Sequence, residues 1–444
     1  MKINKNKQNP NKSGTQGINW FIQLSLFPGL LWLFSGSLDA RFNSFSSSMS
    51  SMGQLSGLIG TALMANTLIL SSRIRPLVSL FGGIEKLYTA HKWGGIAAFT
   101  LLLFHPLFLS LRLLPFSVRS AGLFLLPGGS WEKNLGIAAL IIMTITVLVT
   151  LFANFQYQFL KFTHKFLGAA FLAGSIHGFF IGNSTATSTS LKIYLAALAC
   201  AGAIAFLYRG LFPNRLVQRR AYTVTKVRRV NSAIIELTLA PDSSSPSFHS
   251  GDVVFVTFLT PILPPESHPF SICSATGNAT IQIAIKSVGD YTKQVQNLPV
   301  GTKALIEGPY QSFSHKCKNK DQIWIAGGIG ITPFLGMART LAQNNERRSR
   351  ITLFYSARTE RDLAFLYELQ QLASRKPFFR IIPINTNKDG RLTAEKISNT
   401  CGNLHKKDIL MCGPLSMVQS LQKQFTKLKV PRGNIHTAEF YLLK

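Results

Sequence analysis

Hydrophobic residues follow two different patterns along the 444-residue chain. In the first half they form long runs, and a membrane-spanning helix needs about 20 mostly apolar residues. Six runs approach that length, at residues 18–38, 53–72, 90–111, 134–154, 160–182 and 191–211. From Ala221 onward the pattern changes to short alternating segments between turn residues, which is typical of strands. We therefore expect a six-helix transmembrane bundle followed by sheet domains.

The alternating segments predict two sheet domains of different kinds. YTVTKV, AIIELTL, VVFVTFL and IQIAIKS follow one another with only turns between them, which predicts a small antiparallel β-barrel. After a linker-like stretch, SHKCKNKDQ, strands alternate with helical stretches, which predicts a parallel α/β sheet. The predicted organisation is a tail at 1–17, a transmembrane domain at 18–212, a barrel domain at 216–316 and an α/β domain at 319–444.

Charged residues are unevenly placed, and this changes the reading of the composition. The chain carries 47 Lys and Arg against 18 Asp and Glu, a formal charge of +29. Residues 1–212 hold 16 of the basic residues and only three acids, Asp39, Glu85 and Glu132. No nucleic-acid-binding motif accompanies the positive charge, so we expect no nucleic-acid partner. The 33 Phe exclude a disordered chain, and five Cys are too few for a disulfide scaffold.

The basic residues predict the orientation of the spans, because Lys and Arg concentrate on the cytoplasmic side. The N-terminal tail and the flanks on its side hold 14 of them, including Arg215, Arg219 and Arg220 just after the last span, and the opposite loops hold five: Arg41, Arg112, Arg119, Lys133 and Lys192. We expect a multi-pass protein of the cell membrane, with the bacterial inner membrane favoured and both termini cytoplasmic. The lipid bilayer is therefore a predicted partner.

Four histidines are the only ones in the first half: His91, His105, His164 and His177. Two lie on the third predicted span and two on the fifth, and ionisable residues at membrane depth are candidates for function. Their separations of 14 and 13 residues correspond to roughly 21 and 20 Å along a helix. One His on each span thus lies near each membrane face, and each level offers two imidazoles to one flat group. We expect two b-type haems with these histidines as iron ligands.

The spacing also predicts a distortion in the fifth span. On an ideal helix 14 steps return to within about 40° of the starting face, whereas 13 steps miss it by about 140°. Nearby glycines either leave room for a porphyrin or serve ordinary helix packing, and the sequence leaves both readings open: Gly94, Gly95, Gly168, Gly174 and Gly178.

The second half contains an ordered series of short motifs. HPFS begins at His268, KSVGDYT at Lys286, GPY at Gly308, GGIGITP at Gly327, YSAR at Tyr355 and CGP at Cys412. Glycines at a strand-to-helix turn allow a pyrophosphate to approach backbone N–H groups and a helix N-terminus. The series resembles the ferredoxin–NADP reductase-like flavoproteins. With the two His pairs, the chain resembles the short, bacterial-type members of the ferric reductase and NADPH oxidase superfamily.

The resemblance implies a ferric reductase-like domain at 18–212, an FAD-binding barrel at 216–316 and an NAD(P)H-binding domain at 319–444. It assigns the flavin contacts and FAD pyrophosphate region to His268, Pro269, Phe270, Ser271, Lys286, Gly289, Thr292, Gly308 and Pro309. It assigns the nicotinamide nucleotide to Gly327, Gly328, Gly330, Thr332, Pro333, Ser356, Arg358, Cys412, Gly413 and Pro414. The residues implied at the reacting centre are Phe270, Ser271, Cys412, and one of Phe440 and Tyr441 as the aromatic that covers the flavin. Arg358 favours NADPH over NADH, because a cation there can meet a 2′-phosphate.

The resemblance implies electron transfer from cytoplasmic NADPH through FAD and two haems to an acceptor outside. Superoxide-forming members carry a second outer His where this chain has Leu109, and an Arg at the outer end of the second span, where MSSMGQLSGL has none. Ferric chelate reduction is therefore the favoured expectation. The alternatives are superoxide formation from oxygen and electron supply to a periplasmic partner or quinone. A channel or transporter gated by a nucleotide-sensing domain is an alternative of another class, and it would need no haem.

Overall fold

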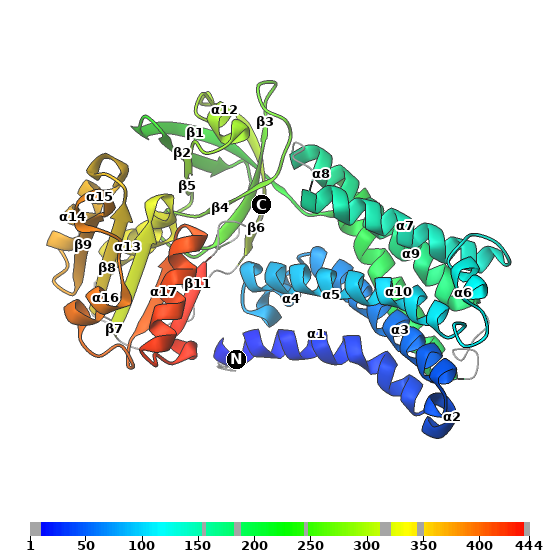
Figure 1. Cartoon of the computed structure of the whole chain (residues 1–444). Coiled ribbons are helices and arrows are strands. Elements are labelled where there is room, and N and C mark those ends of the chain that lie inside the picture. Colours follow the sequence, from blue (N-terminus) through cyan, green and yellow to red (C-terminus); the bar gives the residue numbers. More distant parts are fainter. Residues whose placement is uncertain are drawn as a thin grey trace, which may run out of the picture. The chain divides into compact units, whose positions relative to one another are not determined.

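The computed structural model describes residues 10–152, 157–181, 188–243, 247–310, 321–343 and 350–438. The chain divides into two compact units. Of the described residues, the helical unit comprises those in 15–77 and 86–217, and the sheet unit comprises those from 218 onward together with 10–14 and 78–85. Each unit is described by itself below (Figure 1).

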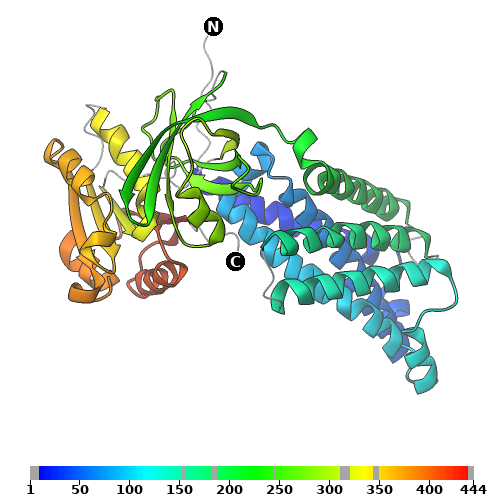
Figure 2. The ribbon, with the colours of Figure 1, turned by 90° about the horizontal axis from the view of Figure 1, so that it is seen from above.

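The helical unit, together with the segments 10–14 and 78–85 that group with the sheet unit, forms the helices of the predicted spans and the short helices between them. They are α1 (Pro10–Leu33), α2 (Leu38–Phe42), α3 (Phe45–Ser71), α4 (Arg75–Phe81), α5 (Ile84–Leu111), α6 (Val118–Phe124), α7 (Trp131–Phe152), α8 (Tyr157–His164), α9 (Phe166–Phe180), α10 (Thr189–Phe206), η2 (Leu207–Leu211) and α11 (Pro213–Leu216). Within this unit α7 packs against α9 and α3 against α10, as Figure 2 also shows.

Four helices in the described part of the chain are long and apolar enough to cross a membrane. They are α3, α5, α7, and α10 continued by η2 (Thr189–Leu211). The first predicted span lies mostly in α1, and the fifth is divided between α8 and α9, which has only 15 residues. Four of the six predicted spans are therefore confirmed as long apolar helices, and the count of six stays a prediction.

The fifth predicted span is broken at Lys165, immediately after His164. The N–H of Lys165 donates to the carbonyl of Phe162 and the N–H of Gly168 to that of Lys165, both over three residues. Such 3₁₀-type winding turns the chain by about 120° per residue rather than 100°. The break therefore adds part of the rotation that a 13-residue spacing lacks on an ideal helix.

The sheet unit begins with a six-stranded antiparallel sheet in the order β4-β3-β6-β1-β2-β5. Its strands are β1 (Arg220–Asn231), β2 (Ile234–Pro241), β3 (Val253–Leu259), β4 (His268–Ser271), β5 (Ile281–Lys286) and β6 (Lys303–Tyr310), with helix α12 (Asp290–Val295) after β5. An isolated bridge between Ile272 and Ile283 links the chain after β4 to β5. The antiparallel sheet is confirmed, and its closure into a barrel stays a prediction.

A five-stranded parallel sheet follows, in the order β11-β10-β7-β8-β9. Its strands are β7 (Asp321–Gly327), β8 (Arg350–Ala357), β9 (Phe379–Asn385), β10 (Asp408–Cys412) and β11 (Ile435–Ala438). The intervening helices are η4 (Gly328–Ile331), α13 (Thr332–Gln343), η5 (Glu360–Asp362), α14 (Leu366–Ser374), α15 (Thr386–Asp389), α16 (Ala394–Cys401), α17 (Leu415–Lys427) and η6 (Arg432–Asn434). Most of the predicted linker lies outside the described residues, and its last two residues, Asp321 and Gln322, belong to β7.

The parallel sheet is covered on both faces, which explains its continuous apolar strands. One face buries Trp324, Phe334 and Leu369 against α13 and α14. The other buries Ile325 and Phe425 against α16 and α17. Because β8 lies on one side of β7 and β10 on the other, the chain reverses its strand order between β7 and β10. Open α/β sheets bind ligands at the carboxyl ends of strands at this reversal.

Candidate functional site

The four histidines of the helical unit meet in two pairs across helices. The ring centroids of His91 on α5 and His164 on α8 lie 6.3 Å apart. Those of His105 on α5 and His177 on α9 are also 6.3 Å apart. A metal–imidazole bond is about 2.0–2.1 Å, so two imidazoles bound on opposite sides of one metal ion place their ring centroids roughly 6 Å apart. Both pairs therefore have the separation that one shared iron requires.

Backbone carbonyls hold three of these rings by their Nδ1 atoms. The Nδ1 of His91 lies 2.9 Å from the carbonyl oxygen of Thr67, and that of His105 lies 2.7 Å from the carbonyl of Gly53. The Nδ1 of His177 lies 2.7 Å from the carbonyl of Glu132. A carbonyl only accepts, so each Nδ1 carries the proton and Nε2 keeps its lone pair for a metal. Such carbonyl partners orient histidine ligands in metal sites.

Two glycines on neighbouring helices make room for the rings of one pair. A Cβ on Gly57 of α3 would lie 2.6 Å from the Nδ1 of His105. A Cβ on Gly136 of α7 would lie 2.7 Å from the Nδ1 of His177. The sequence analysis did not single out either glycine, because their role depends on which helix packs against which ring.

The five glycines that the sequence singled out divide into two groups. A Cβ on Gly94 would meet Phe21 at 2.5 Å, and one on Gly168 would overlap Phe206, so these two serve helix packing. A Cβ on Gly95 or Gly174 would have its nearest neighbour only at 3.8 or 3.9 Å. Gly178 has nothing within 4 Å. Gly95 lies one turn from His91 and Gly174 one turn from His177, so open space accompanies the paired rings, as a flat prosthetic group requires.

Basic side chains gather beyond the His105–His177 pair. Arg112 directly follows the end of α5 at Leu111 and lies seven residues after His105, a spacing of about 10.5 Å along a helix. Its guanidinium carbon and the Nζ of Lys133 lie 5.5 and 5.2 Å from the ring centroid of Phe124. The Nε of Arg112 is buried and has no hydrogen-bond partner among the described residues. Arg112, Lys133 and Phe124 are called the cationic cluster below.

The flavin motif lies on the edge strand β4 of the antiparallel sheet. His268 stacks on Tyr291 with centroids 3.9 Å apart, and its Nε2 lies 2.8 Å from Glu266. Phe270 is half-buried against the core of this sheet, and Ser271 is buried. Pro269 lies between His268 and Phe270 in the strand and pairs with Phe255 of β3.

Two further motif regions lie around this strand. Val253 of β3 pairs with Ser271 on one side and with Tyr310 on the other, which places Gly308 and Pro309 across β3 from the flavin motif. Lys286 ends β5, and Gly289 caps α12, where a Cβ would meet nothing within 4 Å. The Thr292 hydroxyl accepts hydrogen bonds from the N–H groups of Val288 and Gly289. The buried Ser267 Oγ has no partner among the described residues.

The nucleotide motifs converge at the carboxyl edge of the parallel sheet. A Cβ on Gly327 would lie 2.7 Å from Pro414, and one on Gly413 would lie 2.9 Å from Gly327. Gly330 lies directly against the carbonyl of Cys412. Positions 330 and 413 therefore favour glycine because two loops pack backbone against backbone, and position 327 because the Pro414 ring and the Met417 side chain lie against it.

Gly328 differs from its neighbours in the same loop. Its φ is +54°, which favours glycine, and a Cβ there would meet nothing within 4 Å. Thr332 and Pro333 begin the buried first turn of α13, so the loop leads into a helix N-terminus as phosphate binding requires. This arrangement suits the binding of a pyrophosphate, which the sequence predicted for this loop.

Three other predicted nucleotide contacts lie at this edge. Ser356 pairs with Gly327 at the end of β8 and is buried, and the exposed Arg358 follows two residues later. Cys412 is fully buried, and this burial raises the pKa of its thiol well above its usual range. No disulfide joins the cysteines that the structure describes, so Cys412 is a neutral thiol. Phe440 and Tyr441 lie outside the described residues.

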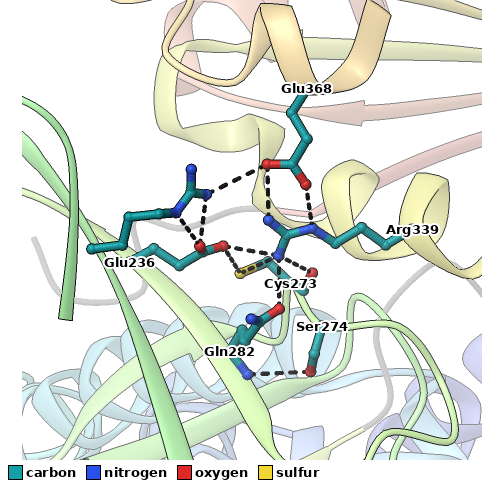
Figure 3. Close-up of polar contacts among 7 residues, drawn as sticks. Glu236, Cys273, Ser274, Gln282, Arg339 and Glu368 are labelled. Atoms are coloured by element: carbon teal, nitrogen blue, oxygen red, sulfur yellow. Dashed lines mark hydrogen bonds and ion pairs between the residues drawn. The ribbon is translucent and has the colours of Figure 1, made fainter. Parts of the chain in front are cut away.

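One guanidinium joins the flavin side to the nucleotide side. Arg339 of α13 contacts Glu236 of β2, Cys273 after β4, Gln282 of β5 and Glu368 of α14 (Figure 3). Burial alone would raise the pKa of Glu236, but the charges of Arg339 and Arg228 outweigh it and hold this pKa below its ordinary value. No motif pointed to Arg339, because its partners come from distant parts of the sequence.

Comparison with known proteins covers most of the chain with three family matches. Residues 56–175 match the family described as "Ferric reductase like transmembrane component". Residues 219–323 match "FAD-binding domain", and residues 324–423 match "Oxidoreductase NAD-binding domain". The three matches follow one another in the order that the motifs indicated.

Individual relatives resemble parts of the chain. NADH-cytochrome b5 reductase 1 of Laccaria bicolor is 30% identical over 177 residues, 37% of this chain and 58% of the relative. Phenol hydroxylase P5 protein of Acinetobacter pittii is 30% identical over 249 residues, 52% of this chain and 67% of the relative. The first three curated relatives are matched over only 35%, 58% and 66% of their length. Flavohemoglobin from Malassezia yamatoensis, solved with bound FAD and heme, gives a TM-score of 0.50 at 16% identity, covering 91% of this chain and 99% of that one, and it shows a shared fold alone.

Proposed function

Because the chain belongs to the ferric reductase and NADPH oxidase superfamily, with ferredoxin–NADP reductase-type domains, we propose that it transfers electrons across a membrane. NADPH would be the donor on the cytoplasmic side, and a ferric chelate the acceptor on the other. The observation that carries the proposal is the pair of facing imidazoles at each of two levels, both with centroids 6.3 Å apart. This arrangement supports two haems, each of which would be held by two histidines.

The cofactors supply the redox chemistry and the protein positions them. When bound, FAD accepts a hydride from NADPH and returns two electrons singly, which haem iron carries one at a time. One NADPH therefore reduces two ferric ions to ferrous ions and leaves NADP⁺ and one proton. His91 and His164 are proposed to hold the inner haem, and His105 and His177 the outer one. Thr67, Gly53 and Glu132 orient three of these rings through their carbonyls.

The sheet unit is proposed to hold the nucleotides in the arrangement of its motifs. The half-buried Phe270 and buried Ser271 on β4 belong to the flavin side, together with His268 and Pro269. Lys286, Gly289, Thr292, Gly308 and Pro309 would line the rest of the FAD site, and the open space at Gly289 supports this. The loop from Gly327 to Pro333 would hold the NADPH pyrophosphate, with Ser356, Cys412, Gly413 and Pro414 beside it.

Arg358 supports NADPH as the donor. It is exposed just beyond the carboxyl end of β8, where a guanidinium can form two charge-assisted hydrogen bonds with a 2′-phosphate. NADH, which lacks that phosphate, would be used less well.

The cationic cluster supports an anionic acceptor. Arg112 and Lys133 converge on one ring beyond the His105–His177 pair, and ferric ions chelated by polycarboxylates such as citrate carry negative charge. At the position where superoxide-forming members carry a second outer His, Leu109 packs against α3, since a Cβ on Gly53 would lie 2.7 Å from its Cδ2. These two observations favour ferric chelate reduction over superoxide formation.

The basic flanks support an orientation with both termini in the cytoplasm. Six spans return both ends of the helical unit to the same side, which agrees with a sheet unit that meets cytoplasmic NADPH. The bacterial inner membrane is the proposed location.

The proposal is tested with purified protein in vesicles, with NADPH added on the side that exposes the sheet unit. We expect haem absorbance, its reduction by NADPH, and ferrous iron formed from ferric citrate on the opposite side. Superoxide is measured in parallel with the same preparation. Absence of the haem Soret band would overturn the proposal and favour a nucleotide-gated channel. Superoxide formation without iron reduction would instead identify oxygen as the acceptor.

A further inference from the structure

Arg339 connects the two kinds of sheet within one unit. It lies on α13, seven residues or about two turns after Thr332 at the nucleotide loop. Its side chain is only 15% exposed. Figure 3 shows its guanidinium between Glu368 on one side and Glu236, Cys273 and Gln282 on the other. One side chain thus reaches from α13, at the nucleotide loop, to the antiparallel sheet that carries the flavin motif.

The contacts to each side are short and directional. Toward α14, Nε and Nη2 donate to the two oxygens of Glu368 at 2.6 and 3.0 Å, a bidentate pair. Toward the antiparallel sheet, Nη1 lies 3.0 Å from the carbonyl of Cys273 and 2.9 Å from the Oε1 of Gln282. It also lies 2.8 Å from the Oε1 of Glu236. The rigid fork of an arginine therefore fixes direction as well as distance.

The network closes through a second arginine. Arg228 of β1 approaches Glu236 at 2.6 Å and Glu368 at 3.4 Å. Arg228, Glu236, Arg339 and Glu368 therefore form a closed ring in which two cations and two anions alternate. A buried ion pair is weak support for stability because desolvation offsets the attraction. The closed ring thus acts chiefly as a geometric restraint between the two sheets.

The neighbours of Arg339 on the same helix face also contact the segment after β4. A Cβ on Gly336 would lie 2.9 Å from the carbonyl of Ile272 and 3.1 Å from the Cα of Cys273. The Thr340 hydroxyl accepts the backbone N–H of Thr276 at 3.0 Å. Positions 336, 339 and 340 share one face of α13. This face therefore holds the segment 272–276, which directly follows Ser271 of the flavin motif.

We propose that Arg339 is a positioning residue that sets the distance between the nicotinamide and flavin sites. The inference rests on the proposed function. It adds that the ion-pair ring, rather than any group touching the cofactors, fixes the alignment for hydride transfer. A misplacement of about 1 Å caused by a distant mutation can cost about a hundredfold in rate. Arg339 lies two helical turns from the nucleotide loop and donates to the carbonyl of Cys273, two residues after Ser271. A change in the position of its guanidinium would therefore affect both sites.

The test compares Arg339→Lys with Arg350→Lys in the full protein loaded with FAD. Lysine keeps the charge but loses the fork. Arg350 is the matched control, because it makes a bidentate pair with Asp321 at 3.0 and 2.8 Å between two strands of the parallel sheet. Flavin reduction by NADPH is followed by stopped flow without oxygen, together with FAD content, NADPH affinity and amide exchange of residues 272–276.

For Arg339→Lys we expect flavin reduction at saturating NADPH to slow by about tenfold to a hundredfold. Its FAD content and NADPH affinity should stay within about twofold of the parent values, and amide exchange at residues 272–276 should become faster. Arg350→Lys should resemble the parent in every measurement. A parental reduction rate in Arg339→Lys, or slowing in proportion to lost FAD, would overturn the inference. If Arg339→Lys does not fold, Glu368→Gln serves in its place, because it keeps the contacts to Glu236. A parent that does not reduce its flavin with NADPH contradicts the proposed function itself.

Discussion

The imidazoles of His105 and His177 face each other across α5 and α9 with their centroids 6.3 Å apart and their planes inclined by 74°. Their Nδ1 atoms bond to carbonyls from two other helices, the carbonyl of Gly53 on α3 and that of Glu132 on α7. Four helices thus converge on one pair of rings. The proposed outer haem site can therefore be tested by substituting its histidine ligands and by substituting the residues on neighbouring helices that contact them.

His105→Leu should remove one of two haems and stop electron transfer across the membrane, because one axial ligand is lost. Flavin reduction by NADPH should continue at the parental rate, since the nucleotide sites are untouched. The haem content per protein is measured by absorbance. The rate of ferric citrate reduction is measured with the protein in vesicles. His405→Leu, on the exposed surface of the parallel sheet domain, is the control and should keep both haems. Parental haem content and iron reduction in His105→Leu would exclude the assignment.

Gly57→Ala and Gly136→Ala should each weaken the outer haem while leaving the inner one. The added Cβ would lie 2.6 or 2.7 Å from a ring nitrogen, so the ring must move. Haem retention after gel filtration and the midpoint potentials of both haems measure the effect. Gly122→Ala, where a Cβ meets nothing within 4 Å, is the matched control. Equal haem retention in all three variants would show that the rings do not need this space.

Arg112→Gln and Lys133→Gln should each raise the KM for ferric citrate by about twofold to fivefold, the range of one exposed ion pair. Added salt should weaken citrate reduction in the parent more than in the variants, because salt screens the removed attraction. Reduction of an uncharged ferric chelate should change little. Arg119→Gln, on α6 between Arg112 and Lys133 in the sequence but outside the cationic cluster, is the control. A KM shift of equal size for the uncharged chelate would argue against charge recognition.

Arg358→Ser should raise the KM for NADPH about tenfold or more and leave the KM for NADH nearly unchanged, since only NADPH carries the 2′-phosphate. Steady-state flavin reduction with each donor gives the ratio. Arg361→Ser, three residues further along the chain in η5, is the control. Equal loss with both donors would place Arg358 outside the 2′-phosphate site.

The lowered pKa of Glu236 predicts a stability that depends on pH. A carboxyl whose pKa is lower in the folded protein stabilises it fully above the ordinary value of 4.5, and this contribution is lost as pH falls through the folded pKa. The midpoint temperature of unfolding of the sheet unit, followed by flavin release from the full protein, should therefore fall as pH drops below about 4.5. Glu236→Gln should show a shallower fall over that window. Identical pH profiles would mean that Glu236 is not ionised in the folded state.

The sequence predicted the fold where a pattern is local. Long apolar runs indicated α3, α5 and α7 to within several residues, because length in a bilayer is set by the rise of the helix. Alternating segments indicated β1, β2, β3 and β5, and the glycine-rich turn located the start of α13. The boundaries were less accurate: α3 begins at Phe45 rather than at residue 53, and α1 ends at Leu33 rather than at residue 38. The fifth span was predicted as one helix that needed a distortion, and the structure divides it at Lys165.

The sequence by itself determined the two levels of histidine, because the rise of a helix converts a spacing of 13 or 14 residues into a fixed length. It also determined the order of the nucleotide motifs, since each depends on a short run of residues. Only the tertiary structure decided which carbonyls hold the rings, which glycines lie beside them, and that Arg339 joins the two sheets. Those relationships depend on how helices and sheets pack, and backbone carbonyls or distant ion-pair partners leave no local pattern in a sequence.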